Sequence, residues 1–328
     1  MRWLVPAAAL AATACWTPID RVELESAAAI PAPLRTSAQH DSVMSGGSWP
    51  YVVRASHPSG GELTYFGSAH TRDPANPQIE AMRTAWRESR PTVALTENTG
   101  GWVLGGSLDR GIRSLGEFAV PIHLARSQDI PVYSLEPTWE AELADARAAF
   151  PVEELLVFYT LRVFLAERGD RTGEDIDDLA RHLLRKRGSR PGFEGVIPDL
   201  AAFDSVWDAA FGAELGDWRT LPPEAVWPND GGHSLQRIAD VVNRSRDRHM
   251  IRAILHHLER GERVFAVAGG SHVVIQEPAL RAAAAGRVGA VRPLTRASAP
   301  ATRTRPPPSA PAAPGAARRV PRPRTSRA

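Results

Sequence analysis

The stretch from Arg263 to Glu277, RVFAVAGGSHVVIQE, constrains the fold of this chain most. Its first six residues, 263–268, are mostly apolar and partly β-branched, which predicts a short strand buried on both faces. Gly269 and Gly270 follow at once, and without a Cβ they allow a sharp turn or the close approach of another group. They place the imidazole of His272 at the end of the strand. The stretch therefore predicts a buried β-strand that ends in a polar group.

The same arrangement follows other strand-like runs. The run Glu62–Phe66 leads into Gly67-Ser-Ala-His70, a second Gly-x-x-His motif. Two further runs, 91–96 and 130–135, each end in a glutamate. In open α/β sheets, sites form outside the carboxyl ends of the strands, so parallel strands would bring these four polar groups to one edge. The four predicted site residues are His70, Glu97, Glu136 and His272.

The order of the predicted elements indicates an α/β fold. Strands at 51–55 and 62–66 flank a polar loop and predict a β-hairpin. A helix over about 77–89, between strands, predicts a crossover that makes the strands at 62–66 and 91–96 parallel. Helical patterns then interrupt the alternation from about 138 to 215. We expect one α/β domain over about 51–295, with a mixed, mostly parallel sheet flanked by helices and a helical insertion over about 138–215.

Three helices outside the strand–helix alternation carry specific expectations. Residues 152–166 are apolar nearly all round, which indicates a helix buried between layers, and a helix that lines a substrate cavity is the alternative. A long helix is expected over about 234–259, directly before the strand at 263–268. Pro278 is expected to open a last helix that Gly286 closes, before a short strand at 288–291.

The amino terminus resembles an export signal. Met1-Arg2 is a short basic start, residues 3–12 are apolar, and two small residues precede Cys15, the single cysteine. The apolar run is too short to span a membrane, which takes about 20 apolar residues. The position of Cys15 resembles a bacterial lipobox, in which the cysteine is lipidated. We expect an exported protein tethered by Cys15 to a bacterial membrane, on its periplasmic or cell-surface side; cleavage of an ordinary signal after Ala14 is the alternative.

Composition sets two segments apart from the predicted domain. Residues 16–50 contain Ala, Ser, Pro and Gly with no period, which predicts a flexible tether. Residues 296–328 contain eight arginines and no acidic residue, which predicts a disordered basic tail. Without that tail the chain has 31 basic and 37 acidic residues, a net charge of −6. The predicted domain therefore gives no reason to expect nucleic-acid binding.

The motifs together carry a family resemblance. Two Gly-x-x-His motifs at strand ends, with Glu97 and the sequence Ser134-Leu-Glu-Pro137 between them, resemble the TraB/GumN/TIKI family. Arg246-Asp247, on the long helix, resembles the Arg-Asn or Arg-Asp pair of that family. The family is similar to the erythromycin esterases and to the ChaN-type haem-binding lipoproteins, and the resemblance covers about 51–291. It implies an α/β fold of that type and adds Arg246 to the site. This chain departs from the family at Asn98, where an acidic residue is frequent.

The resemblance leaves three functions open. Similarity to the TIKI proteins implies a metal-dependent peptidase, with Mn, Co or Zn held by His70, Glu97 and His272 and with the bound water activated towards a pKa of about 7. Similarity to the erythromycin esterases implies the same residues without a metal, with a histidine as general base. In both, Arg246 could stabilise developing negative charge, and the substrate is a peptide or a small molecule. Similarity to ChaN implies haem or iron binding without turnover, for which Tyr65 could supply an axial ligand.

Overall fold

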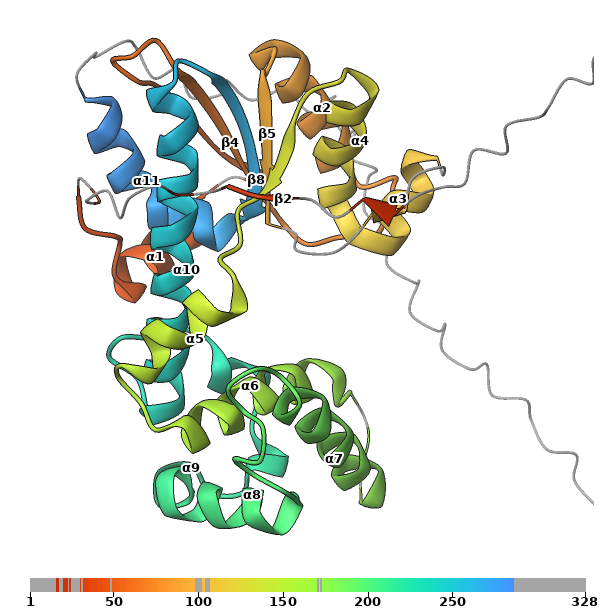
Figure 1. Cartoon of the computed structure of the whole chain (residues 1–328), viewed down its shortest axis with the longest axis vertical. Helices are drawn as coiled ribbons and strands as arrows, with labels where there is room; N and C mark the ends of the chain where they lie inside the picture. Colours follow the sequence, from red (N-terminus) through yellow and green to blue (C-terminus); the bar gives the residue numbers. More distant parts are fainter. Residues whose placement is uncertain are drawn as a thin grey trace, which may run out of the picture. The chain divides into compact units, whose positions relative to one another are not determined.

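The strands form a six-stranded sheet in the order β2-β7-β5-β8-β4-β3 (Figure 1). This computed structural model describes residues 16–17, 20–22, 24, 30, 32–47, 49–97, 102–103, 107–169, 171 and 173–285. The hairpin β3–β4 is antiparallel, and every other neighbouring pair in the sheet is parallel. The predicted α/β fold with a mixed, mostly parallel sheet is confirmed. The strands of this sheet are β2 (Asp20–Arg21), β3 (Tyr51–Ser56), β4 (Glu62–Ser68), β5 (Val93–Thr96), β7 (Val132–Ser134) and β8 (Arg263–Gly269).

β8 is the last strand of this sheet along the chain, but it lies in the middle of the sheet. It pairs with β4 on one side and with β5 on the other. β4 and β5 are therefore parallel, as the crossover predicts, but they are not neighbours. β8 is buried on both faces because Val264, Ala266 and Ala268 point to one layer of helices while Phe265 and Val267 point to the other. A separate pair of short strands, β1 (Trp16–Thr17) and β6 (Trp102–Val103), is antiparallel.

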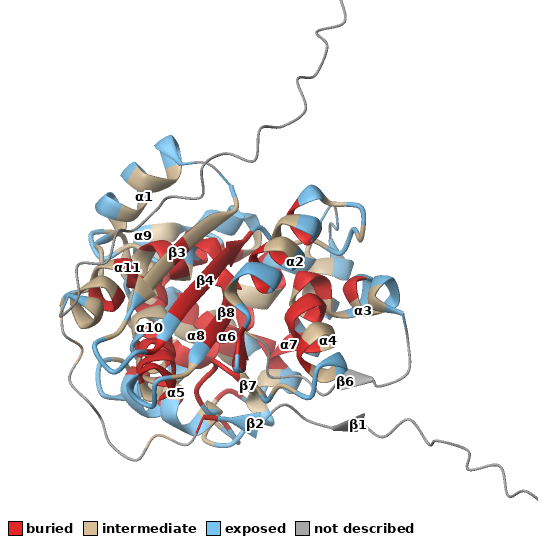
Figure 2. Ribbon diagram, turned by 90° about the horizontal axis from the view of Figure 1, so that it is seen from above, coloured by how far each residue is buried: buried red, intermediate tan, exposed pale blue. Residues whose placement is uncertain are grey.

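Helices cover both faces of the sheet, and its inner strands β4, β5 and β8 are buried between them (Figure 2). On one face, α10 (Ser234–Glu259) and α11 (Gly270–Ala284) pack against it. On the other face lie α2 (Pro77–Ser89), α3 (Leu108–Leu115) and α4 (Ala119–Ser127), with the 3-10 turn η1 (Gly116–Phe118) between the last two. The predicted bounds of α2 and α10 are confirmed. α2 has a clear start signal, because Asn76 caps it and Pro77 is its first residue.

The predicted helical insertion is present and has a core of its own. The amino-terminal half of α10, from Leu235 to Val242, belongs to this core, whereas its second half, from Met250 on, packs on the sheet. α10 therefore joins the two cores. Residues 155–161 of α6 are all buried, which confirms the prediction of a helix between layers. The insertion consists of α5 (Trp139–Arg147), α6 (Val152–Glu167), α7 (Glu174–Gly188), α8 (Leu200–Trp207), the π-helix η2 (Asp208–Gly212) and α9 (Ala213–Leu215); the 3-10 turns η3 (Trp218–Thr220) and η4 (Pro223–Val226) lead to α10.

The start of the last helix differs from the prediction. α11 begins at Gly270, directly after β8, and Pro278 lies inside it. Proline has no N–H to donate to the carbonyl four residues before it, which here is that of Val274. The guanidinium of Arg35 donates to that carbonyl instead, and a second nitrogen donates to Glu277 at 2.8 Å. A partner from a distant segment therefore compensates for the proline, which the local pattern could not show.

The prediction of a flexible tether over 16–50 is wrong for the described part of that segment. β2 joins the sheet beside β7, and a helix, α1 (Ser37–Gly46), follows. Thr36 and Gln39 cap α1 reciprocally, a signal that the sequence pattern Thr-x-x-Gln carries. Arg35 fixes the segment to α11, more than 200 residues away in sequence. The segment is ordered by these long-range contacts rather than by a local hydrophobic period.

Several predictions fall on residues outside the described ranges: the export signal with Cys15, most of the loop after Glu97 including Asn98, the strand at 288–291, and the tail at 296–328. The described residues all belong to one compact unit, residues 1–293. Within the described ranges, no helix combines the length and the apolarity that crossing a bilayer takes.

Candidate functional site

The carboxyl ends of four strands meet at one edge of the sheet. The register pairs Ser68 of β4 with Gly269 of β8, and Thr96 of β5 with both Val267 of β8 and Ser134 of β7. The four strands therefore end at similar heights, and the next residues along the chain lie close together. The structure brings together all five residues named from the sequence, with Arg246 reaching them from α10: His70, Glu97, Glu136, Arg246 and His272.

The glycines of the two motifs allow a close approach rather than a left-handed turn. Gly269 has φ −54°. A Cβ there would lie 3.2 Å from Nε2 of His70 and 3.4 Å from Oε2 of Glu97, so these two polar groups both border the bare face of Gly269. A Cβ on Gly67 would lie 2.8 Å from the carbonyl oxygen of Tyr51. Gly269 makes room for the site, and Gly67 makes room for the neighbouring strand.

His70 is held by a buried carboxylate. Its Nδ1 lies 2.9 Å from Oε1 of Glu117, which is 1% exposed, and the other oxygen of Glu117 accepts from the backbone N–H of Thr71. The hydrogen bond to Glu117 raises the pKa of His70 despite the opposing effect of burial. The His70 side chain is itself 68% exposed. The pairing leaves Nε2 of an accessible imidazole directed towards the site.

His272 has the same kind of support but is buried. Its Nδ1 lies 2.7 Å from Oδ1 of Asp247, which also accepts from Gln276 at 2.7 Å. Its Nε2 lies 3.5 Å from Oε1 of Glu97. Burial opposes a charge on His272, but the carboxylates of Glu97 and Asp247 outweigh it and raise the pKa. Both imidazoles therefore contact a buried carboxylate through Nδ1. Nε2 of His272 faces Glu97, and Nε2 of His70 borders the same face of Gly269 as Oε2 of Glu97.

Glu97 is the centre of the site. Its Oε1 accepts from Arg246 at 2.8 Å, and its Oε2 accepts from the N–H of Gly269 at 2.7 Å, at the amino terminus of α11. Burial would raise the pKa of Glu97, but the charges of His272 and Arg246, together with that N–H and His70, lower it to about 2. Glu97 therefore stays ionised near neutral pH, where it accepts hydrogen bonds and does not carry a proton.

Arg246 joins the two glutamates. Its Nε donates to Glu136 at 2.9 Å, one Nη2 N–H donates to each glutamate, and Nη1 donates to Asn243 at 3.2 Å. The two carboxylates raise the pKa of Arg246 against the effect of burial. Four of its five N–H groups are thus in use. Arg246 mainly holds the two carboxylates in place, and its capacity to bind a developing negative charge is smaller than its position in the sequence suggests.

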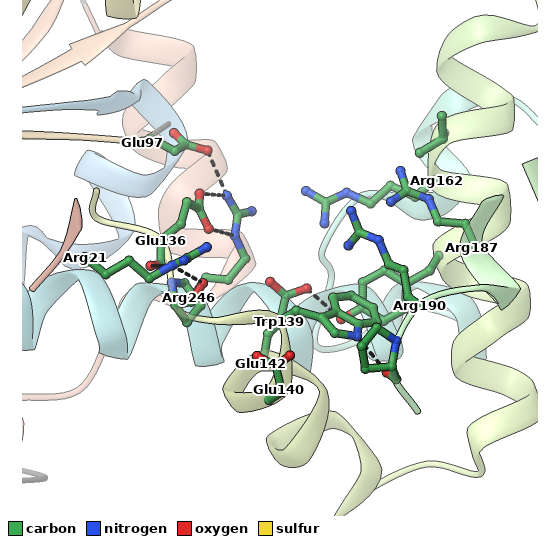
Figure 3. A pocket seen from close by; sticks show the side chains of 14 residues that line it. Arg21, Glu97, Glu136, Trp139, Glu140, Glu142, Arg162, Arg187, Arg190 and Arg246 are labelled. Carbon is green, nitrogen blue, oxygen red and sulfur yellow. Dashed lines mark hydrogen bonds and ion pairs between the residues drawn. The ribbon is translucent and has the colours of Figure 1, made fainter. Parts of the chain in front are cut away.

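A cavity of about 530 Å³ opens beside Glu97, Glu136 and Arg246. Figure 3 shows that these residues form one wall and that Arg162, Arg187 and Arg190 of the insertion extend from the opposite side towards the space between. We call it the arginine cavity. Because α6 contributes Tyr159, Arg162 and Val163, that helix is both a core element and, as the alternative prediction held, a cavity wall.

A second cavity, of about 570 Å³, lies on the side of His70. Its lining includes His70 and Asp247 together with the apolar side chains of Met44, Trp227 and Ile275. We call it the histidine cavity. Arg162 lines both cavities, which places the site residues between an arginine-rich pocket and a more apolar one.

The predicted metal ligands His70, Glu97 and His272 fit a metal ion only in part. Two imidazoles and a carboxylate are a suitable donor set, and Nδ1–carboxylate contacts are typical of histidines that bind metals through Nε2. However, within the described ranges no three His, Cys, Asp or Glu side chains are grouped so that they could hold a metal ion. Arg246 and the N–H of Gly269 also each occupy an oxygen of Glu97. In this arrangement the three residues do not form a metal site, and the metal remains a prediction from the resemblance.

Sequence reasoning missed several residues that support the site. Glu117 carries no recognisable signal, since it lies in a 3-10 turn after α3. Asp247 directly follows Arg246, and Gln276 is four residues after His272 on the same helix face. Their distance in sequence from the predicted site residues could therefore have identified both. Tyr65 is fully buried and donates to Gln276, so its suggested role as an exposed axial ligand is wrong.

Two of the histidines outside the motifs have structural roles. His233 caps α10, and His257 contacts Glu262 and stacks on Tyr133. These two are structural. His123, His249 and His256 do not line either cavity.

No protein-family model matches this chain, and neither a search of curated proteins nor one of solved structures finds a match.

Proposed function

We propose that this chain is a hydrolase that cleaves an ester or peptide bond of a small substrate without a metal, with His70 as general base. One observation carries the proposal: two imidazoles, each oriented by a buried carboxylate, lie at one ionised glutamate beside a cavity, with Nε2 of His272 facing Glu97 and Nε2 of His70 bordering the same face of Gly269 as Oε2 of Glu97. An imidazole whose Nδ1–H donates to a carboxylate has a lone pair on Nε2 that can accept a proton from water.

The residues suggest a division of roles. His70, accessible and with a raised pKa, takes a proton from a water held between its Nε2 and Oε2 of Glu97, and later gives that proton to the leaving group. Glu97 orients the water. His272 and Arg246 keep Glu97 ionised and in place. The first N–H groups of α11, which have no partner within the helix, are suited to stabilise the oxyanion that forms on the attacked carbonyl.

Generic p-nitrophenyl esters and fluorogenic peptides, assayed with and without a chelator, test the proposal. We expect turnover that resists chelation, falls by about 100-fold or more in His70→Gln and His272→Gln, and is unchanged in His182→Gln. His182 is an exposed histidine on α7 outside both cavities, so it controls for the loss of an imidazole. Activity that chelation abolishes and Mn, Co or Zn restores would favour the metal-dependent peptidase. No turnover together with a stoichiometric Soret band on haemin titration would favour the binding alternative.

Export and membrane attachment through Cys15 are part of the same proposal. The lipobox-like sequence around Cys15 supports them. In a bacterial host, Cys15→Ser should move the protein from the membrane fraction to the soluble fraction. Unchanged membrane retention would contradict lipidation.

A further inference from the structure

The insertion side of the arginine cavity carries positive charge without ionic partners. Arg162 comes from α6, Arg187 from the end of α7 and Arg190 from the turn after it. Among the described residues, no carboxylate lies within ion-pair or hydrogen-bonding distance of these three guanidinium groups, and Nε of Arg187 is buried without a partner. Arg162 and Arg187 are partly buried, whereas Arg190 is exposed. Burial of a guanidinium group without an ionic partner costs free energy, and this cost falls on Arg162 and Arg187.

Each acidic residue of the cavity either has another hydrogen-bond partner or is exposed. Glu97 and Glu136 share Arg246 on the opposite wall. Glu142 accepts from the hydroxyl of Tyr159 at 2.6 Å, and Glu140 is exposed. The positive charge on the insertion side therefore remains available to a ligand.

An aromatic contact fixes the position of Arg190. The guanidinium of Arg190 stacks over Trp139 at 4.7 Å from the ring centroid, and Trp139 is fixed by its N–H bond to the carbonyl of Pro191 at 2.9 Å. Burial and neighbouring positive charge lower the pKa of both Arg162 and Arg187. A bound anion would relieve both effects, and the planar fork of arginine matches the two oxygens of a carboxylate or a phosphate.

We infer that the insertion side of the arginine cavity binds an anionic group of the substrate, a carboxylate or a phosphate, while the bond to be cleaved lies at His70 and Glu97. Arg162 lines both cavities, so a single small molecule can contact it and extend to the site residues. The inference rests on the proposed function, because it names the class of substrate on which that hydrolase acts: small esters or amides with a negative charge on the part that lies towards the insertion.

Binding without turnover is the first test. The full chain is titrated calorimetrically with glutarate, with inorganic phosphate and with the neutral glutaramide. We expect millimolar or tighter binding of an anion, weaker binding at high salt, and none of the diamide. Arg162→Gln and Arg187→Gln should each weaken binding about 10-fold or more, and Arg162→Lys, which keeps the charge but loses the fork, should weaken it less. Arg185→Gln is the matched control, because Arg185 lies on α7 like Arg187 but is exposed and outside the cavity.

Turnover is the second test, with p-nitrophenyl acetate compared with mono-p-nitrophenyl glutarate. We expect the anionic ester to have the lower KM, Arg162→Gln to raise the KM of the anionic ester more than that of the neutral ester, and Arg185→Gln to change neither. The relative affinity of glutarate and phosphate decides between a carboxylate and a phosphate. If anion binding depends on Arg162 but no ester or peptide is hydrolysed, the proposed function is contradicted and the anion site is supported. Failure of both anions to bind at millimolar concentration, or equal losses in Arg162→Gln and Arg185→Gln, would overturn the inference.

Discussion

Replacing Arg246 with methionine tests the electrostatics on which the site depends. Methionine keeps most of the apolar stem of the side chain but removes the cation that Glu97 and Glu136 share. The Glu97 side chain is only 12% exposed, so water compensates little for the lost charge. Removal of one partner of a buried ion pair costs about 3–5 kcal/mol of stability, because it leaves the other charge buried and uncompensated.

The sign of the pH dependence follows from the pKa of Glu97. Its ordinary value of 4.5 falls to about 2 in the folded chain. Ionised Glu97 therefore stabilises the fold fully above about pH 4.5, and this stabilisation is lost as the pH falls from there towards 2. At 1.36 kcal/mol per pKa unit, the difference corresponds to about 3 kcal/mol at pH 7 and to about 1 kcal/mol at pH 3.

Urea unfolding of the wild type and of Arg246→Met at both pH values measures the share of this contribution that Arg246 supplies, beside those of His272, the N–H of Gly269 and His70. We expect a deficit of about 3–5 kcal/mol at pH 7 that shrinks by about half at pH 3, because Glu97 is then largely neutral in the unfolded chain and less dependent on Arg246. Arg244→Met, two residues away on α10, removes pairs of Arg244 with Asp230 and Asp240 on the partly exposed side and should cost only about 0–1 kcal/mol. A deficit that is the same at pH 7 and pH 3, or no larger than that of the control, would refute the electrostatic role of Arg246.

Three further predictions address the base, the motif glycines and the segment before β3. Glu117→Gln should lower the pKa of His70, so that the acidic limb of the pH profile of kcat/KM moves to lower pH; an unmoved limb would show that His70 is not the base. Gly269→Ala should reduce kcat about 10-fold or more by displacing His70, while the Tm changes little because φ −54° suits alanine. Gly67→Ala should instead cost roughly 1–3 kcal/mol of stability, because its Cβ would clash with the backbone of β3. Equal stability losses in the two variants would contradict this distinction. Arg35→Met should cost about 1–3 kcal/mol in urea unfolding because the carbonyl freed by the proline in α11 loses its donor, and an unchanged midpoint would contradict that role.

Local patterns in the sequence contain a large part of this fold. Apolar runs with β-branched residues predict β4, β5 and β8, and the polar residue directly after each strand predicts which side chains meet at the sheet edge. The reason is geometric: parallel strands of similar length end at the same edge, so residues that follow them are neighbours whatever the order of the strands. The convergence of His70, Glu97 and His272 at one edge of the sheet could therefore be predicted without knowledge of the strand order.

The partners of those residues were decided only by the tertiary structure. Glu117 lies 47 residues from His70, Arg246 lies 149 residues from Glu97, and Arg35 lies 242 residues from Glu277. A helical or strand period describes neighbours within a few residues and carries no information on such pairs.

The strand order and the cavities depend on packing as well. β8 enters between β4 and β5 because its two apolar faces need a layer of helices on each side, which only the assembled sheet provides. The arginines of the insertion face the site because α6 and α7 pack into their own core and α10 joins that core to the sheet. The sequence by itself therefore determined most of the elements and the strand-end residues of the site, whereas folding determined β2, α1 and the start of α11, what holds the site residues, and what charge faces them across the cavity.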